Sequence, residues 1–165
     1  MTDKRTATAL AIAGCYLHPL TALPDERGSI LKVWRRDDGV INVEDIGEVY
    51  LSTVKPGVVK GWHLHHDMTL RYVCVSGRVL VGLYDNRSAC PTRGTMLKVN
   101  LECRGSDYQM LVVPPGVWNG FRSVGEITSV VLNLPDLPHD PREIERMRPR
   151  DAGWPFDWGA YHYAG

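Results

Sequence analysis

Short runs of β-branched, aromatic and aliphatic residues, separated by turn-forming residues, recur along most of this 165-residue chain. Residues 24–28, 55–57 and 114–116 are turn sequences rich in Pro and Gly. Strands of this length at such spacing predict an all-β sandwich or barrel. The length fits one domain, so we expect residues 1–165 to form it, with residues 1–10 as a flexible arm. The expected strands are 11–20, 29–35, 46–54, 58–66, 70–75, 78–84, 95–101, 109–113 and 128–134.

A helix start is recognisable near the C-terminus. Asp140 is a suitable N-cap, Pro141 suits the first helical position, and Glu143 would complete a capping box. Pro149 disfavours a helix that continues beyond about Met147. We therefore expect one short C-terminal helical segment beside the strands.

The charge balance and the cysteines indicate which partners and which cellular compartment to expect. Lys and Arg number 19, and so do Asp and Glu, which leaves no net charge to draw the chain to nucleic acid or a membrane. The four cysteines form no CxxC pair, which disfavours a structural zinc site or a disulfide framework and fits a reducing compartment. No stretch approaches the roughly 20 apolar residues of a membrane span. We expect a cytoplasmic protein without nucleic-acid or membrane partners.

Three histidines lie within four residues of one expected strand. Alternation along the strand places His63 and His65 on one face, and Leu64 and His66 on the other. Two imidazoles on one face of a rigid strand suit a metal site, or a catalytic base with a partner. The simpler interpretation is that some of them are exposed polar residues of a β-protein.

Two glycine-containing patterns resemble the two cupin motifs. The first is a glycine followed after five residues by His-x-His and later by a closing glycine, and the second has the form Pro-x-Gly-x-x-Asn. The matching residues are Gly57, His63, His65 and Gly77 in the first pattern, and Pro114, Gly116 and Asn119 in the second.

This resemblance implies a cupin jelly roll, but it does not imply a complete metal site. Metal-binding cupins use two histidines and a glutamate from the first motif and a histidine from the second. Here the glutamate position falls on Thr69 or Leu70, and the last ligand falls on Asn119. Divalent metals normally need three or more protein ligands. We expect no metal and no other cofactor, with a site at His63 and His65 as the alternative.

A more extensive resemblance covers roughly residues 11–158. The chain is similar to the dTDP-4-dehydrorhamnose 3,5-epimerase family, jelly-roll cupins that act on nucleotide-linked 4-keto-6-deoxy sugars. Each matching fragment is weak alone, but their common order and spacing are specific. The fragments are Asp25-x-Arg27-Gly28, Lys60-Gly61-x-His63, Gly77-x-Val79, Asp85-x-Arg87, Pro91-Thr92-x-Gly94, Pro114-x-Gly116, Gly120-Phe121 and Asp157-Trp158.

The resemblance implies a set of catalytic roles. His63 would remove a proton α to the C4 ketone, which suits an imidazole whose pKa lies near the working pH. Asp151 aligns with the aspartate that orients this histidine, and Lys60 replaces an arginine near the ketone oxygen, where a cation stabilises the enolate. Arg27 would hold the diphosphate or the sugar. Asp85 matches a carboxylate at the floor of the site.

Other positions are expected to contact the substrate. Arg71 lies beside a family lysine position, His65 occupies a glutamine position, and Asn119 occupies a histidine position. The expected contacts to the nucleotide base are Glu48, Tyr50 and Trp118.

The general acid of the family has no counterpart in this sequence. Its tyrosine position falls on Val131, so Tyr50, Tyr72 or a water molecule would have to replace it. Trp62 and Trp118 are additional aromatic residues, suited either to stacking on a nucleotide or sugar ring or to packing.

The resulting hypothesis is a nucleotide-sugar epimerase or isomerase of deoxysugar and polysaccharide biosynthesis. A catalytically reduced sugar-nucleotide-binding relative and a metal-dependent cupin remain as alternatives. The resemblance also implies a homodimer, in which an N-terminal strand commonly joins the sheet of the partner and covers an exposed edge.

Overall fold

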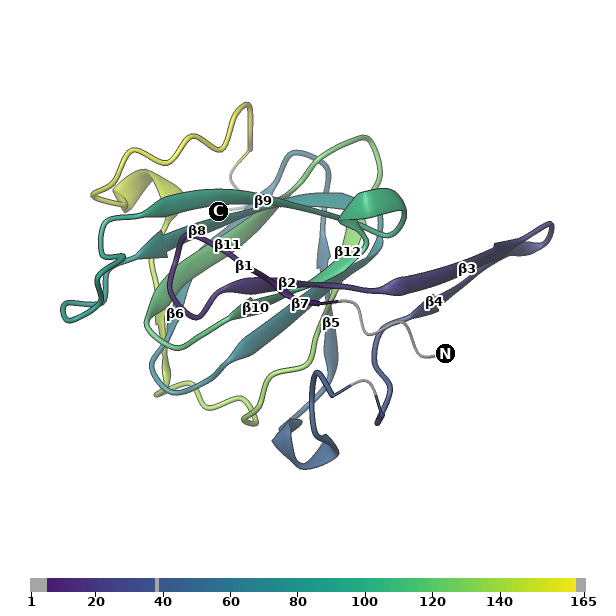
Figure 1. Cartoon of the computed structure of the whole chain (residues 1–165). Coiled ribbons are helices and arrows are strands. Elements are labelled where there is room, and N and C mark those ends of the chain that lie inside the picture. Colours follow the sequence, from purple (N-terminus) through teal and green to yellow (C-terminus); the bar gives the residue numbers. More distant parts are fainter. Residues whose placement is uncertain (1–5, 38, 163–165) are drawn as a thin grey trace.

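The computed structural model describes residues 6–37 and 39–162, and it consists of two largely antiparallel sheets packed face to face (Figure 1). The six-stranded sheet contains, in spatial order, β1 (Thr8–Ala9), β2 (Tyr16–Pro19), β10 (Gln109–Val113), β7 (Leu70–Ser76), β12 (Ser129–Asn133) and β5 (Tyr50–Val54). The five-stranded sheet contains β13 (Ile144–Arg146), β6 (Val59–His65), β11 (Val117–Ser123), β8 (Arg78–Asp85) and β9 (Met96–Glu102).

A separate hairpin of β3 (Thr21–Asp25) and β4 (Gly28–Lys32) extends away from the two sheets (Figure 1). The described helical segments are single 3₁₀ turns, namely η1 (Val43–Asp45), η2 (Gly105–Asp107) and η3 (Pro149–Asp151). Within residues 6–37 and 39–162, no helix has the length and apolar character needed to cross a bilayer.

The period-two alternation of the strands explains how the sheets pack. In β7, Tyr72 and Cys74 face the core between the sheets, whereas Val73 packs into a second cluster on the outer face. In β10, Leu111 faces the core between the sheets and Met110 the outer cluster. The expected all-β jelly-roll sandwich is confirmed.

The same alternation in β6 places its core residues and its two histidines on opposite faces. Trp62 and Leu64 pack beneath the C-terminal segment, with Trp154 and Trp158 in the same cluster. The side chains at 63 and 65 alternate to the opposite face, toward the space between the sheets. The fold therefore brings both histidines to the interior of the sandwich.

The expected C-terminal helix over residues 140–147 is wrong. Asp140 does bind the backbone N–H of Arg142, but this contact closes only one turn. Ile144–Arg146 then pairs with β6 as strand β13, and the Glu143 side chain contacts β6 and the following turn instead of capping a helix. Tertiary pairing therefore overrides the local capping signal.

The expected flexible arm over residues 1–10 is only partly described. Residues 1–5 lie outside the described residues, whereas Thr8–Ala9 forms β1 and pairs with β2. The end of the expected arm therefore belongs to the six-stranded sheet.

Candidate active site

A cavity of about 420 Å³ lies between the two sheets, a size in the usual range for small-molecule sites. Both sheets contribute to its wall. Its lining consists of Tyr50, Ser52, Tyr72, Val131 and Asn133 from the six-stranded sheet, Lys60, His63, His65, Phe121, Ile144 and Arg146 from the five-stranded sheet, and Glu48 and His139 from loops.

His63 is placed as the sequence predicts, with its imidazole in the cavity wall. Burial, the neighbouring cation Arg146, His65 and Lys60 lower the pKa of His63 to about 4. Within the described part of the chain, no carboxylate hydrogen-bonds to this imidazole. His63 is therefore a neutral imidazole at physiological pH, in the protonation state of a base.

Lys60 approaches the cavity from the same strand and is fixed across the gap between the sheets. Its ammonium donates to the Ser52 hydroxyl at 2.6 Å and to the Thr53 carbonyl at 3.3 Å. Burial lowers the pKa of Lys60 from its ordinary value. A positioned cation on the cavity wall can stabilise an oxyanion that forms on a bound molecule.

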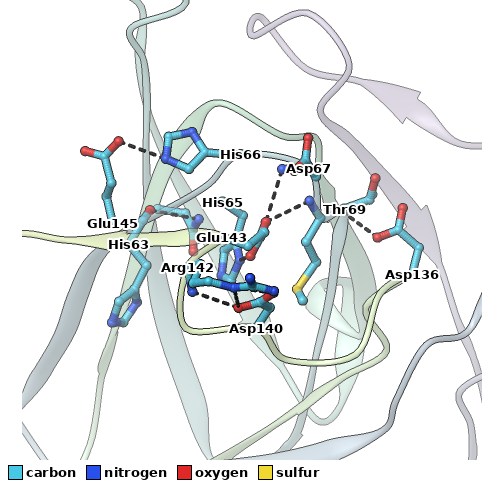
Figure 2. A network of polar contacts seen from close by, with 12 residues as sticks. His63, His65, His66, Asp67, Thr69, Asp136, Asp140, Arg142, Glu143 and Glu145 are labelled. Carbon is cyan, nitrogen blue, oxygen red and sulfur yellow. Dashed lines mark hydrogen bonds and ion pairs between the residues drawn. The ribbon is translucent and has the colours of Figure 1, made fainter.

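His65 forms a buried pair with Glu143, in contrast to His63. The Nδ1 atom of His65 lies 2.7 Å from Glu143 Oε2, and both side chains are less than one-tenth exposed. The other carboxylate oxygen accepts the backbone N–H groups of Asp67 and Met68, whereas the His63 ring lies outside this network (Figure 2). Burial alone would raise the pKa of Glu143, but these hydrogen bonds outweigh it and lower the pKa.

Tyr50 reaches the cavity from β5 and binds Asn133 on the neighbouring strand. The Asn133 amide nitrogen donates to the Tyr50 hydroxyl at 2.9 Å. Asn133 Oδ1 accepts the backbone N–H of Arg71 at 2.9 Å. Burial raises the pKa of Tyr50 from its ordinary value, so the phenol stays protonated at neutral pH.

Tyr72 is buried on the cavity wall and binds Asn119. Its hydroxyl donates to Asn119 Oδ1 at 2.9 Å, while the Asn119 amide nitrogen donates to the carbonyls of His63 and Val117. Asn119 itself is not among the described lining residues, so it acts on the cavity through Tyr72. Burial raises the pKa of Tyr72 well above its ordinary value.

Two residues expected at the site, Asp151 and Arg27, lie elsewhere in the structure. Asp151 ends η3, where its carboxylate pairs with Arg148 and is 43% exposed, so it does not orient His63. Arg27 lies at the turn of the protruding hairpin, paired with Asp25 and 83% exposed. A one-residue shift in the alignment does not correct the expectation for Asp151, because the neighbouring Arg150 and Ala152 carry no carboxylate.

Two further expected contacts, Arg71 and Asp85, bind other parts of the chain and not the cavity. Arg71 donates to the carbonyls of Asp45 and Leu134 and does not line the described cavity. Asp85 is fully buried and accepts hydrogen bonds from Arg87 and Thr92, also away from the described cavity lining. These residues hold loops and strand ends in place.

The two tryptophans considered for stacking are part of the core. Trp62 is 1% exposed and Trp118 is 5% exposed, and both pack against Trp154 of the C-terminal segment. Trp118 is therefore not placed to contact a nucleotide base in this cavity.

Sequence reasoning missed Arg146, His139, Asn133 and Glu143. The β13–β6 pairing places Arg146 opposite His63. His139 and Asn133 line the cavity, and Glu143 orients one of its histidines. Arg146 and Glu143 reach the histidine strand through the long-range β13–β6 pairing, whereas Asn133 lies on β12 of the opposite sheet and His139 lies in a loop. One sequence carries no local signal for these long-range placements.

The alternative metal site lacks a ligand set. Among the described residues, no group of three or more His, Cys, Asp or Glu side chains is arranged to hold a metal ion.

Comparison with known proteins identifies the family of the chain. Residues 9–164 match the sequence profile of dTDP-4-dehydrorhamnose 3,5-epimerase. The probable low-salt glycan biosynthesis epimerase Agl13 of Haloferax volcanii is 34% identical over 82% of this chain and 87% of its own length. The spore coat polysaccharide biosynthesis protein SpsL of Bacillus subtilis is 28% identical over 83% of this chain and 88% of its own.

A solved structure gives the same result. The crystal structure of a dTDP sugar isomerase from Desulfovibrio desulfuricans G20 has a TM-score of 0.82 and 38% identity, covering 88% of this chain and 90% of that one. The sequence profile, the relatives and the cupin-like fold together show that this chain belongs to the dTDP-4-dehydrorhamnose 3,5-epimerase family of sugar epimerases.

Proposed function

We propose that the chain is an epimerase or isomerase of a nucleotide-linked 4-keto-6-deoxy sugar and that His63 removes a proton α to the C4 ketone. The observation that carries this proposal is a neutral imidazole on the wall of a cavity whose lining also contains two cationic side chains, Lys60 and Arg146. The two relatives, named for glycan and spore coat polysaccharide biosynthesis, support a role in polysaccharide assembly.

The proposed chemistry depends on stabilisation of the enolate. When the α C–H bond breaks, its electron pair moves into the carbonyl and leaves negative charge on the ketone oxygen. An imidazole with a pKa of about 4 accepts a proton reluctantly, so the cations must lower the energy of the enolate. Lys60 is held by Ser52 and is suited to this role. Arg146 is the second candidate, since a guanidinium binds the oxygens of a diphosphate or an enolate equally well.

Solvent exchange tests this proposal. The protein is incubated with dTDP-4-keto-6-deoxyglucose in deuterated buffer, and the C3 and C5 protons are followed by NMR. We expect one or both signals to disappear with the wild type and to persist with His63→Asn. Thermal unfolding of both proteins controls for misfolding. Equal exchange by a folded His63→Asn protein contradicts the assignment, and the absence of exchange by the wild type leaves a sugar-nucleotide-binding protein as the better description.

The pair of histidines favours one alternative outcome. His63 and His65 lie two residues apart on one strand face, about 7 Å between their Cα atoms, and Glu143 fixes the ring of His65. Two imidazoles on the same side of a sugar could take a proton from one carbon and return it to the next, which moves the keto group. The NMR spectrum distinguishes the two products, because an isomerase moves the ketone and an epimerase only inverts a carbon.

We further propose that two copies of the chain associate through the β3–β4 hairpin. The hairpin extends from the sandwich (Figure 1), and it exposes Leu23 by 45% and Ile30 by 63%. Burial of these side chains on a partner would remove apolar surface from water. Analytical ultracentrifugation should show a dimer, and replacement of Leu23 and Ile30 by Glu should give a monomer. A wild-type monomer at micromolar concentration would contradict this proposal.

A further inference from the structure

The missing acid at Val131 raises the question of which group protonates the enolate on the face opposite His63. Val131 is buried in the cavity wall and has no proton to give. A proton donor for inversion must line the same cavity, must come from the other wall, and must carry a hydrogen that no protein acceptor already holds.

Two tyrosines from the six-stranded sheet line the cavity across from His63, and the hydrogen bonds of two asparagines distinguish them. For Tyr72, the backbone carbonyls of His63 and Val117 can only accept, so they fix the Asn119 amide nitrogen toward themselves. The Asn119 oxygen then faces Tyr72, and the Tyr72 hydroxyl must donate to it. The phenolic hydrogen of Tyr72 is therefore held by the protein.

The Tyr50 hydroxyl, in contrast, accepts a hydrogen bond from its asparagine. The backbone N–H of Arg71 can only donate, so it fixes Asn133 Oδ1 toward itself and turns the Asn133 amide nitrogen toward Tyr50. The Tyr50 oxygen must accept this hydrogen bond. Among the described residues, no acceptor holds the remaining Tyr50 hydrogen, and the ring is on the cavity wall.

Tyr50 also lies close to Val131, the position at which the family has its acidic tyrosine. The β12–β5 register pairs Val131 with Ser52 and Asn133 with Tyr50, and all four side chains line the cavity from one sheet face. Tyr50 is thus the diagonal cross-strand neighbour of Val131, which places their Cβ atoms about 7 Å apart. A phenol on β5 can occupy the space that a tyrosine on β12 would otherwise fill.

We propose that Tyr50, held by Asn133, is the catalytic proton donor that completes inversion on the sugar face opposite His63. This inference rests on the proposed function. His63 takes the α-proton and the C–H electron pair forms the enolate. The enolate carbon then takes the proton of Tyr50 from the other face, which leaves a phenolate. Solvent returns a proton to Tyr50 and removes one from His63, so the cycle closes without another reactant.

The test measures two rates in deuterated buffer with dTDP-4-keto-6-deoxyglucose. One rate is deuterium entry into sugar that keeps its configuration, and the other is formation of the inverted sugar. Tyr50→Phe should lower inversion at least about 100-fold, the usual contribution of a general acid, while exchange with retention continues from His63. Tyr72→Phe is the matched control, which removes the same hydroxyl from the same wall and should leave the ratio of the two rates as in the wild type.

Each outcome separates this inference from the proposed function. Inversion by Tyr50→Phe at the wild-type ratio overturns the role of Tyr50, and so does loss of inversion in Tyr72→Phe alone. A wild type that exchanges but never inverts overturns the role of Tyr50 and leaves proton abstraction by His63 in place. A wild type that neither exchanges nor inverts overturns both. Thermal unfolding and dTDP binding confirm that each variant is folded.

Discussion

The pH dependence of catalysis should differ from that of an ordinary histidine base, because the environment of His63 disfavours its charged form. Burial is the larger cause and Arg146 the next, and together with other neighbours they lower the pKa of His63 to about 4. At pH 5.5 a group with this pKa is about 97% neutral, whereas an unperturbed histidine with a pKa near 6.5 is about 9% neutral. The structure therefore predicts about tenfold more active base at pH 5.5 than an ordinary histidine would give.

The assay is kcat/KM for solvent exchange between pH 4.5 and 8, since this parameter reports the ionisation of the free enzyme. We expect a plateau that extends down to about pH 5 and a fall only toward pH 4. Arg146→Met removes the neighbouring charge that lowers the pKa of His63 most, so this pKa should rise and the acid limb should move to higher pH. Arg104→Met, which changes an 81% exposed arginine paired with Glu102, is the control and should not move it. An acid limb near pH 6.5 in the wild type would refute this reasoning.

Three further predictions concern stability, measured by urea unfolding. Glu143→Leu should lower the free energy of unfolding by about 3 kcal/mol or more, because it leaves a buried imidazole and two backbone N–H groups without their carboxylate partner. Folding lowers the pKa of Glu143, so this carboxylate stabilises the fold fully above its unfolded-state pKa, and the stabilisation is lost as the pH falls through its folded-state pKa. The difference in the free energy of unfolding between the wild type and Glu143→Leu should therefore shrink in acid. Asp85→Ala should lower the free energy of unfolding by about 3–5 kcal/mol, because it leaves the Arg87 guanidinium without its carboxylate partner. A folded Asp85→Ala protein that has lost only catalysis would contradict the structural role of Asp85. Gly120→Ala should lower the free energy of unfolding by about 1–3 kcal/mol, because the added Cβ would lie 2.9 Å from backbone atoms of β6. At Gly153 an added Cβ meets no atom within 4 Å, so Gly153→Ala should leave the free energy of unfolding unchanged.

The sequence predicted most strands of the two sheets and the histidine face, because both depend on short-range alternation, but it did not predict β3 or β13 as strands. The same rule, applied to Trp62, places it on the face opposite His63, in the core rather than at a cavity mouth. The stacking interpretation failed because it considered the aromatic residue type and not the direction of the side chain.

The partners of the two histidines could not be predicted, because they depend on long-range pairing. The capping signal at Asp140 suggested a helix, but pairing of Ile144–Arg146 with β6 turned this segment into a strand. That pairing brings Arg146 beside His63 and Glu143 beside His65, whereas Asp151 stays with Arg148. The family alignment had suggested Asp151 as a partner of His63, whereas the carboxylate that binds a cavity histidine is Glu143, on His65.

The most direct measurement of the central claim is the mass of the nucleotide sugar recovered from deuterated buffer. We expect wild-type protein to add one or two mass units to dTDP-4-keto-6-deoxyglucose and folded His63→Asn protein to add none. Unchanged mass after incubation with wild-type protein that binds dTDP, or the same increase with both proteins, would contradict proton abstraction by His63.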